Sequence, residues 1–174
     1  MPENHEERND VLISLEAVLV NEFRVYQSLR DLTLEERQVL LEGRGQNLMS
    51  IVDKKEELLD ELTQMETKRN QLIDKIADIF DIQQNYENLG ELLDYIHAEP
   101  IKRLQRLRQG LVALQTEIRD INRGNAALAS LNLEKITQLQ NYLFKLFTST
   151  SQYQPVGGQV YADGPASWGM DQRA

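Results

Sequence analysis

The chain contains no cysteine, and it has only four prolines and nine glycines among its 174 residues. Without cysteine it can form no disulfide framework, no thiolate zinc site and no cysteine nucleophile. No uninterrupted apolar run is longer than residues 17–20, which is far too short to span a membrane. The first ten residues are acidic and polar, unlike a secretory signal peptide. We therefore expect a cytoplasmic protein with no membrane insertion.

Basic residues are also few, because 19 Lys and Arg stand against 28 Asp and Glu, which gives a net charge of −9. Nucleic-acid binding needs a basic excess to contact phosphates, so we expect no nucleic-acid partner. One basic block, from Lys102 to Arg108, could still contact nucleic acid. The interpretation that we favour is ion pairing with the acidic end of a neighbouring helix. These acids are Asp74, Asp78 and Asp81.

Aromatic residues make up only 6% of the chain, and this scarcity, with abundant Leu, Gln, Glu, Lys and Arg, is typical of long helices. Hydrophobic periodicity predicts helices over residues 10–30, 33–43, 46–80 and 101–148, and a short amphipathic helix within 81–99. Thr33 and Glu36 have capping-box spacing, which predicts a new helix start at Thr33. The segment Gly43-Arg44-Gly45 predicts a turn.

Two of the predicted helices carry apolar seams at heptad spacing, which must pack on other helices. The seam of 46–80 is Leu48, Ile51, Lys55, Leu58, Leu62, Met65, Arg69, Leu72, Ile76 and Ile79. The seam of 101–148 is aliphatic in its first half and turns polar at Asn125, Asn132 and Lys135. A connector of about 20 residues lets these two helices pair antiparallel, with the second outlasting the first by roughly 20 Å. The helix over 10–30 would cover part of that overhang.

The fold class that follows is all-α, an elongated antiparallel helical hairpin or coiled-coil bundle of about three long helices. We expect a flexible leader over residues 1–9, a helical domain over 10–148 and a disordered tail over 149–174. The tail combines Gly, Pro, Ser and Gln with scattered aromatic and aliphatic residues. It could be a linear binding element or a simple frayed terminus.

Nothing in the sequence indicates catalysis. His5 and His97 each lack a second histidine or an acid at metal-ligand spacing. The glycines at 43 and 45 lack the strand and the Gly-Lys-Ser/Thr ending of a phosphate-binding loop. We therefore expect no enzyme activity, no cofactor and no metal.

Asn122 and Asn125 lie one turn apart on one helix face, with Gly124 between them. A glycine inside a helix costs about 1 kcal/mol relative to alanine, so its presence suggests close approach by another helix. The two amides could bond a partner's helix. Alternatively, Asn125 could be a polar layer inside the hairpin, and periodicity alone favours this second interpretation.

Three blocks of the sequence together resemble a known family. The first is Lys55-x-x-Leu58-Leu59-x-x-Leu62, with Arg69 one heptad later. The second is Arg119-Asp120-Ile121-Asn122-Arg123-Gly124-Asn125, and the third is Tyr153 followed by Gly157-Gly158-Gln159. The order and spacing of these blocks across residues 11–160 resemble the FlgN-like flagellar export chaperones.

The resemblance implies a cytoplasmic chaperone of the flagellar type III export system. Such a protein binds hook-associated proteins at the hook–filament junction, keeps them unassembled and delivers them to the export gate and to components of the export ATPase complex. Since a long helix with spare apolar surface can accept another helix, we expect the client-binding face on the last long helix to be Asn122, Asn125, Leu128, Leu131, Leu139 and Leu143. The implied segment for client holding and gate docking is Tyr153, Gly157 and Gly158. A homodimer when free and a structural coiled-coil adaptor without export role stay open as alternatives.

Overall fold

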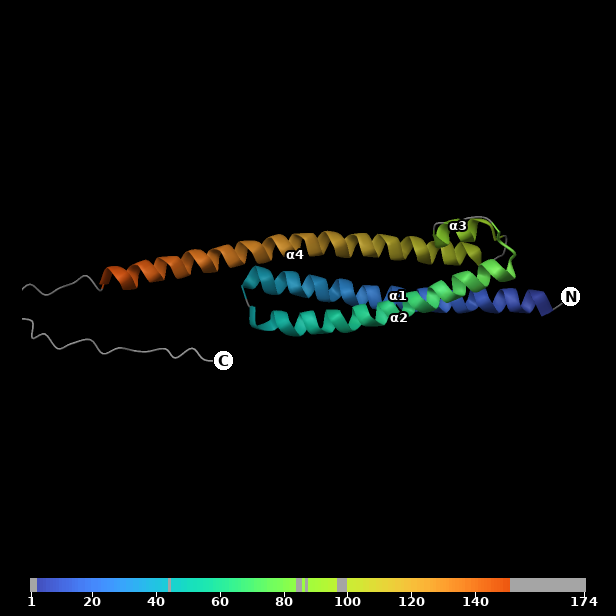
Figure 1. The fold of residues 1–174 in the computed structure, drawn as a ribbon, viewed down its shortest axis with the longest axis horizontal. Helices are drawn as coiled ribbons and strands as arrows, with labels where there is room; N and C mark the ends of the chain where they lie inside the picture. The colour runs from blue at the N-terminus through green and yellow to red at the C-terminus, as the bar shows by residue number, and fades with distance from the viewer. Residues whose placement is uncertain (1–2, 44, 84–85, 87, 97–99, 151–174) are drawn as a thin grey trace, which may run out of the picture. The chain divides into compact units, whose positions relative to one another are not determined.

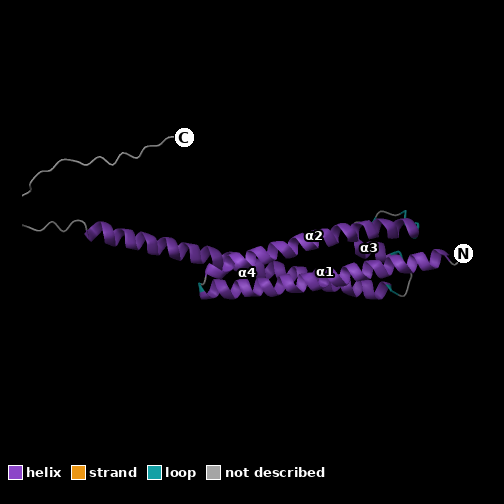
Figure 2. Ribbon diagram, turned by 90° about the horizontal axis from the view of Figure 1, so that it is seen from below, coloured by secondary structure: helices purple, strands orange, loops and turns teal. Residues whose placement is uncertain are grey.

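The computed structural model describes residues 3–43, 45–83, 86, 88–96 and 100–150, and within these ranges the side chains from residue 6 to residue 146. The elements are α1 (Glu3–Glu42), the 3-10 helix η1 (Gly45–Asn47), α2 (Leu48–Ile79), α3 (Leu89–Asp94) and α4 (Ile101–Thr150). Among the described residues there is no strand, as Figures 1 and 2 show. The predicted all-α class with three long helices is confirmed.

The chain divides into two compact units, residues 1–134 and residues 135–174. The first unit contains α1, α2, α3 and α4 as far as Glu134. The described part of the second unit is the remainder of α4.

Within the first unit, α2 runs antiparallel to α1, and α4 runs parallel to α1, so that the three helices lie side by side (Figure 1). Side-chain bonds between α1 and α4 advance together along both helices. Gln115 donates to Tyr26, Asn125 to the Thr33 carbonyl, and Asn132 to the Leu40 carbonyl. Because α1 and α2 are antiparallel, α2 and α4 are antiparallel too, as the sequence predicted.

The first long helix was predicted incorrectly at both ends. It begins at Glu3 rather than residue 10, so residues 3–9 of the predicted leader are helical. Arg8 helps to hold this segment, because its Nη2 donates to the Ile79 carbonyl at 3.3 Å and its guanidinium lies 5.0 Å from the centre of the Phe80 ring.

The predicted break at Thr33 is also wrong, since α1 continues through it. Thr33 is fully buried, and its hydroxyl donates to the Leu29 carbonyl one turn earlier, at 2.6 Å. A buried threonine bonded back to its own helix does not cap a new one. The turn itself is confirmed at Gly43, which follows α1 with a φ of +67°, a conformation that favours glycine.

The core of the first unit consists of two apolar clusters. The first joins the N-terminal half of α1, the C-terminal end of α2, the α3 region and the first three turns of α4, and the second continues along the three long helices. The first comprises Val11, Leu12, Leu15, Leu19, Ile76, Leu92, Leu93, Ile96, Ile101, Leu104 and Leu111. The second comprises Val25, Leu29, Leu62, Leu114 and Ile118. These residues confirm the apolar seams of 46–80 and of the first half of 101–148.

The short helix α3 confirms the predicted amphipathic segment between α2 and α4. Asn88 caps it, because its Oδ1 accepts from the backbone N–H of Gly90 and Glu91. The same oxygen accepts from Arg108 at 3.1 Å, which fastens α3 to α4.

The basic block of α4 makes other contacts than those predicted. Arg103 forms an ion pair of 2.6 Å with Glu16 of α1, and Arg108 bonds Asn88. Since α1 lies beside α4 along the bundle, the acid that pairs with Arg103 comes from α1 and not, as predicted, from the end of α2.

Candidate functional site

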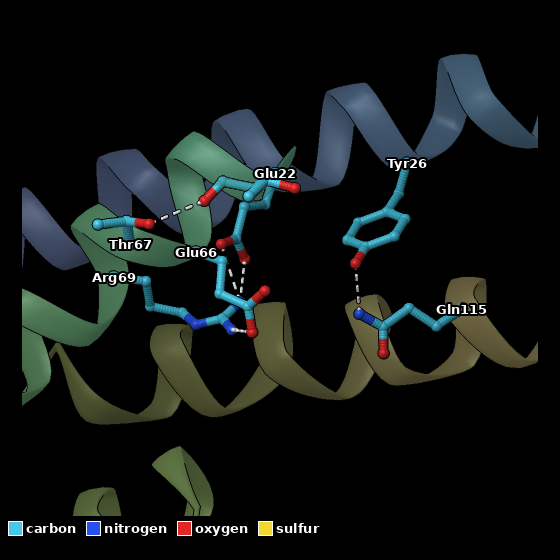
Figure 3. A network of polar contacts seen from close by, with 7 residues as sticks. Glu22, Tyr26, Glu66, Thr67, Arg69 and Gln115 are labelled. Atoms are coloured by element: carbon cyan, nitrogen blue, oxygen red, sulfur yellow. Dashed lines mark hydrogen bonds and ion pairs between the residues drawn. The ribbon is translucent and has the colours of Figure 1, made fainter. Parts of the chain in front are cut away.

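Two polar layers cross the first unit where the sequence predicted charged residues in an apolar seam. The first, which we call the Arg69 layer, consists of Glu22, Glu66 and Arg69. Arg69 Nη1 lies 2.8 Å from both carboxylate oxygens of Glu22, and its Nη2 lies 3.3 Å from Glu66 (Figure 3). Close by, Gln115 of α4 donates to the Tyr26 hydroxyl at 2.8 Å. The layer therefore joins α1 to α2 and neighbours a bond that joins α1 to α4.

Glu22 is almost completely buried, with 1% of its surface exposed. Burial raises the pKa of its carboxyl above the usual value, because loss of hydration outweighs the opposing charge and hydrogen bonds of Arg69, and Glu66 adds a smaller rise. Glu22 was not among the residues predicted from the sequence. The available signal was its place on the apolar face of its helix, between Leu19 and Leu29.

The second polar layer, which we call the Lys55 layer, joins all three long helices. Lys55 of α2 lies 2.9 Å from Glu36 of α1 and donates to the Asn122 side chain of α4 at 3.1 Å. Asn125 of α4 donates to the same Glu36 at 2.8 Å and to the Thr33 carbonyl at 2.9 Å. Each helix thus contributes a polar group at one level, so sliding any one helix would break these bonds.

These contacts decide between the two interpretations of Asn125. It is 3% exposed and lies between α4 and α1, so it belongs to a polar layer inside the bundle. The prediction that Asn125 is part of a client-binding face is wrong. Asn122 is exposed but is already bonded to Lys55. The family-pattern residues Lys55 and Arg69 likewise serve the packing of the three helices.

Gly124 has the close neighbour that its helical position suggested. A Cβ at this position would lie 2.9 Å from Nη1 of Arg37, so the guanidinium of α1 rests over the glycine of α4.

The three family-pattern leucines of α2 divide between inside and outside. Leu62 is buried and Leu58 packs against the second core cluster. Leu59 belongs to the family pattern but is 49% exposed, so it lies outside the core of the first unit. Consecutive residues of a helix point about 100° apart, and Leu59 is turned away from the core that Leu58 contacts.

The second unit presents an apolar face on α4. Ile136, Leu139, Tyr142 and Leu143 follow one another at helical spacing and are 54%, 58%, 60% and 42% exposed. We call these four residues the C-terminal stripe. It contains Leu139 and Leu143 of the predicted face and adds Ile136 and Tyr142. In the first unit, Leu131 is 53% exposed and Leu128 is half-buried.

Three predicted site residues, Tyr153, Gly157 and Gly158, lie outside the described residues. Within the described ranges, no cluster of three His, Asp or Glu side chains could hold a metal ion. No helix among the described residues is both long enough and apolar enough to cross a membrane.

Three amphipathic helices held in register by polar layers, with an apolar helix face left exposed, define a helical protein suited to binding other polypeptides. A model of the family described as FlgN protein matches residues 11–160, and the chain belongs to this family. Comparisons with curated proteins and with solved structures gave no match. The FlgN family consists of flagellar export chaperones, not enzymes, so the resemblance noted in the sequence is confirmed.

Proposed function

We propose that this chain is a cytoplasmic export chaperone that binds hook-associated proteins, prevents their premature assembly and delivers them to the export gate. Membership of the FlgN family supports the general role. The observation that carries client binding is the C-terminal stripe, because apolar side chains exposed at helical spacing can pack against the apolar face of another helix.

The client segment that we propose is the C-terminal part of a hook-associated protein, which folds into an amphipathic helix on the stripe. Burying a leucine side chain contributes about 1.5–3 kcal/mol, and ordering a client segment costs about 2–5 kcal/mol. A stripe of four apolar residues therefore gives moderate affinity, which suits a chaperone that must release its cargo.

Delivery to the gate and to the export ATPase complex rests on the resemblance of Tyr153 and Gly157-Gly158 to the family tail. Contact of a client with Leu128 and Leu131 likewise stays a prediction. These assignments form part of the proposal, and the experiment below does not depend on them.

The test uses co-expression with the C-terminal segment of a cognate hook-associated protein, followed by size-exclusion chromatography and titration. The wild-type chain should co-elute with the segment. Leu139→Ala combined with Leu143→Ala should weaken binding at least about tenfold, because two buried leucines are worth more than the 1.4 kcal/mol of a tenfold change.

A matched control is Leu41→Ala with Leu59→Ala. These leucines are 59% and 49% exposed, against 58% and 42% for Leu139 and Leu143, but lie in the first unit. The control should bind like the wild type, and circular dichroism should show equal helicity in all three proteins.

Two outcomes would contradict the proposal. Loss of helicity in the Leu139 and Leu143 variant would mean that these residues support the fold. Absence of co-elution with any hook-associated segment would leave the structural adaptor as the better description.

A further inference from the structure

The helix segment that carries the C-terminal stripe differs in charge from the rest of the chain. Between residues 135 and 150 the sequence contains two lysines, Lys135 and Lys145, and no Asp or Glu. The chain as a whole has 28 acids against 19 bases. An exposed apolar stripe in an acidic protein is thus accompanied only by cations and neutral side chains.

Both lysines lie within one helical turn of the stripe. Lys135 precedes Leu139 by four residues, and Lys145 follows Tyr142 by three, which are the spacings of neighbours on a helix surface. The nearest acid in the sequence, Glu134, precedes Leu139 by five residues and points about 140° away from it. A partner helix on the stripe would therefore meet positive charge at both ends and no negative charge from this segment.

We infer that the partner of the C-terminal stripe is an amphipathic helix whose apolar face is flanked by Asp or Glu, and that Lys135 and Lys145 select it. This inference rests on the proposed function and specifies the chemistry of the client. It also argues against a second copy as occupant. Two copies of the segment would bring lysine toward lysine in either orientation, with no acid between 135 and 150 to compensate.

The lysines act on choice of partner more than on total affinity. Exposed ion pairs contribute little each, whereas like charges in the same positions repel, and complementary charges speed association. Salt screens charges at a surface within about 8 Å at physiological ionic strength. The expected signature is a preference between partners that disappears at high salt.

The experiment uses the full chain and two fluorescent helical peptides that share the same apolar face. One peptide has Glu at every flanking position and the other has Lys. Fluorescence anisotropy should give at least about fivefold tighter binding of the Glu peptide in low salt. The ratio of the dissociation constants of the two peptides should approach one in about 0.5 M NaCl.

Charge variants of the chain test whether the two lysines cause the preference. Lys135→Glu with Lys145→Glu should reverse the preference for the Glu peptide. Lys135→Gln with Lys145→Gln should abolish this preference without adding negative charge near the C-terminal end of α4. Lys54→Glu with Lys68→Glu changes the net charge equally at exposed positions of α2, and should leave the preference intact.

The outcomes separate this inference from the proposed function. If both peptides bind equally tightly in low salt, the inference is wrong and the docking face stands. If neither peptide binds, the docking face and the inference both fail. Self-association that Leu139→Ala with Leu143→Ala abolishes would make a second copy the occupant, and would also overturn the inference.

Discussion

At the scale of single residues, a few polar side chains set the alignment of three amphipathic helices. Apolar stripes can slide by a heptad with little change in burial, whereas Lys55 bonds Glu36 and Asn122 in one register only. Buried ion pairs contribute little net stability because desolvation opposes them. Their consequence here is specificity of packing.

The raised pKa of Glu22 makes a prediction about the substitution Glu22→Gln. A raised folded-state pKa stabilises the fold at low pH, and this contribution is lost as pH rises through that pKa. The free energy of unfolding of the wild type minus that of E22Q should therefore fall as pH rises above about 4.3, by at most about 1.4 kcal/mol per pH unit. Urea unfolding at several pH values, followed by circular dichroism, measures this difference in the free energy of unfolding.

Glu66→Gln is the matched control for this titration. The Glu66 side chain also bonds Arg69 but is 62% exposed, and its charge is the smallest of the contributions to the pKa of Glu22, so this variant should keep most of the pH dependence that Glu22 gives the wild type. A difference between wild type and E22Q that rises with pH would show that Arg69 outweighs burial.

The sequence predicted some residues of the two polar layers but not the residues with which they pair. Lys55, Arg69 and Asn125 stand out because they interrupt apolar seams. Their partners Glu22 and Glu36 could not be assigned, since a pairing depends on which helix faces which.

At the scale of elements, apolar residues at helical spacing predicted α2, α3 and α4 well, although polar residues interrupt the seams of α2 and α4. The same spacing failed for α1. Thr33 and Glu36 have the spacing of a capping box, but α1 continues through them. Tertiary contacts override the local pattern, because the Thr33 carbonyl accepts a hydrogen bond from Asn125 of α4 while Thr33 lies within a continuous helix. Residues 3–9 are polar, so no apolar period revealed the first turns of α1.

The glycines of α4 give a prediction at this scale. Gly124→Ala should raise the free energy of unfolding by about 0.5–1 kcal/mol, since alanine favours helix and only the exposed, flexible end of Arg37 must move. Thermal unfolding and urea titration would measure the gain.

Gly110→Ala is the comparison in the same helix. Its Cβ would lie 3.0 Å from the Phe23 ring, which packs against both core clusters and cannot withdraw as a guanidinium can. We expect a loss of about 1 kcal/mol from overpacking. Equal gains in the two variants would show that the ring yields as easily as the arginine.

At the scale of the whole molecule, the sequence predicted antiparallel pairing of α2 and α4 but gave α1 too small a part. In the first unit α1 contacts both other long helices. It contacts α2 through Glu22 and Arg69, and it contacts α4 from the Arg103–Glu16 ion pair to the bond of Asn132 with the Leu40 carbonyl. Length alone could not reveal this, because seams predict that helices pack and not which ones are neighbours. The predicted mismatch in helix length is present, since α2 has 32 residues and α4 has 50.

If packing and binding fall to different apolar residues of one helix, as we propose, substitutions at these residues should have unequal effects on stability. Leu104 is fully buried in the first unit, so Leu104→Ala should lower the free energy of unfolding by about 2–5 kcal/mol. Leu139 is 58% exposed in the second unit, so Leu139→Ala should change it by no more than about 0.5 kcal/mol. Urea titration of both variants decides the matter. A large loss for Leu139→Ala would mean that the stripe is covered by the molecule itself, and a client helix would then have to displace that cover.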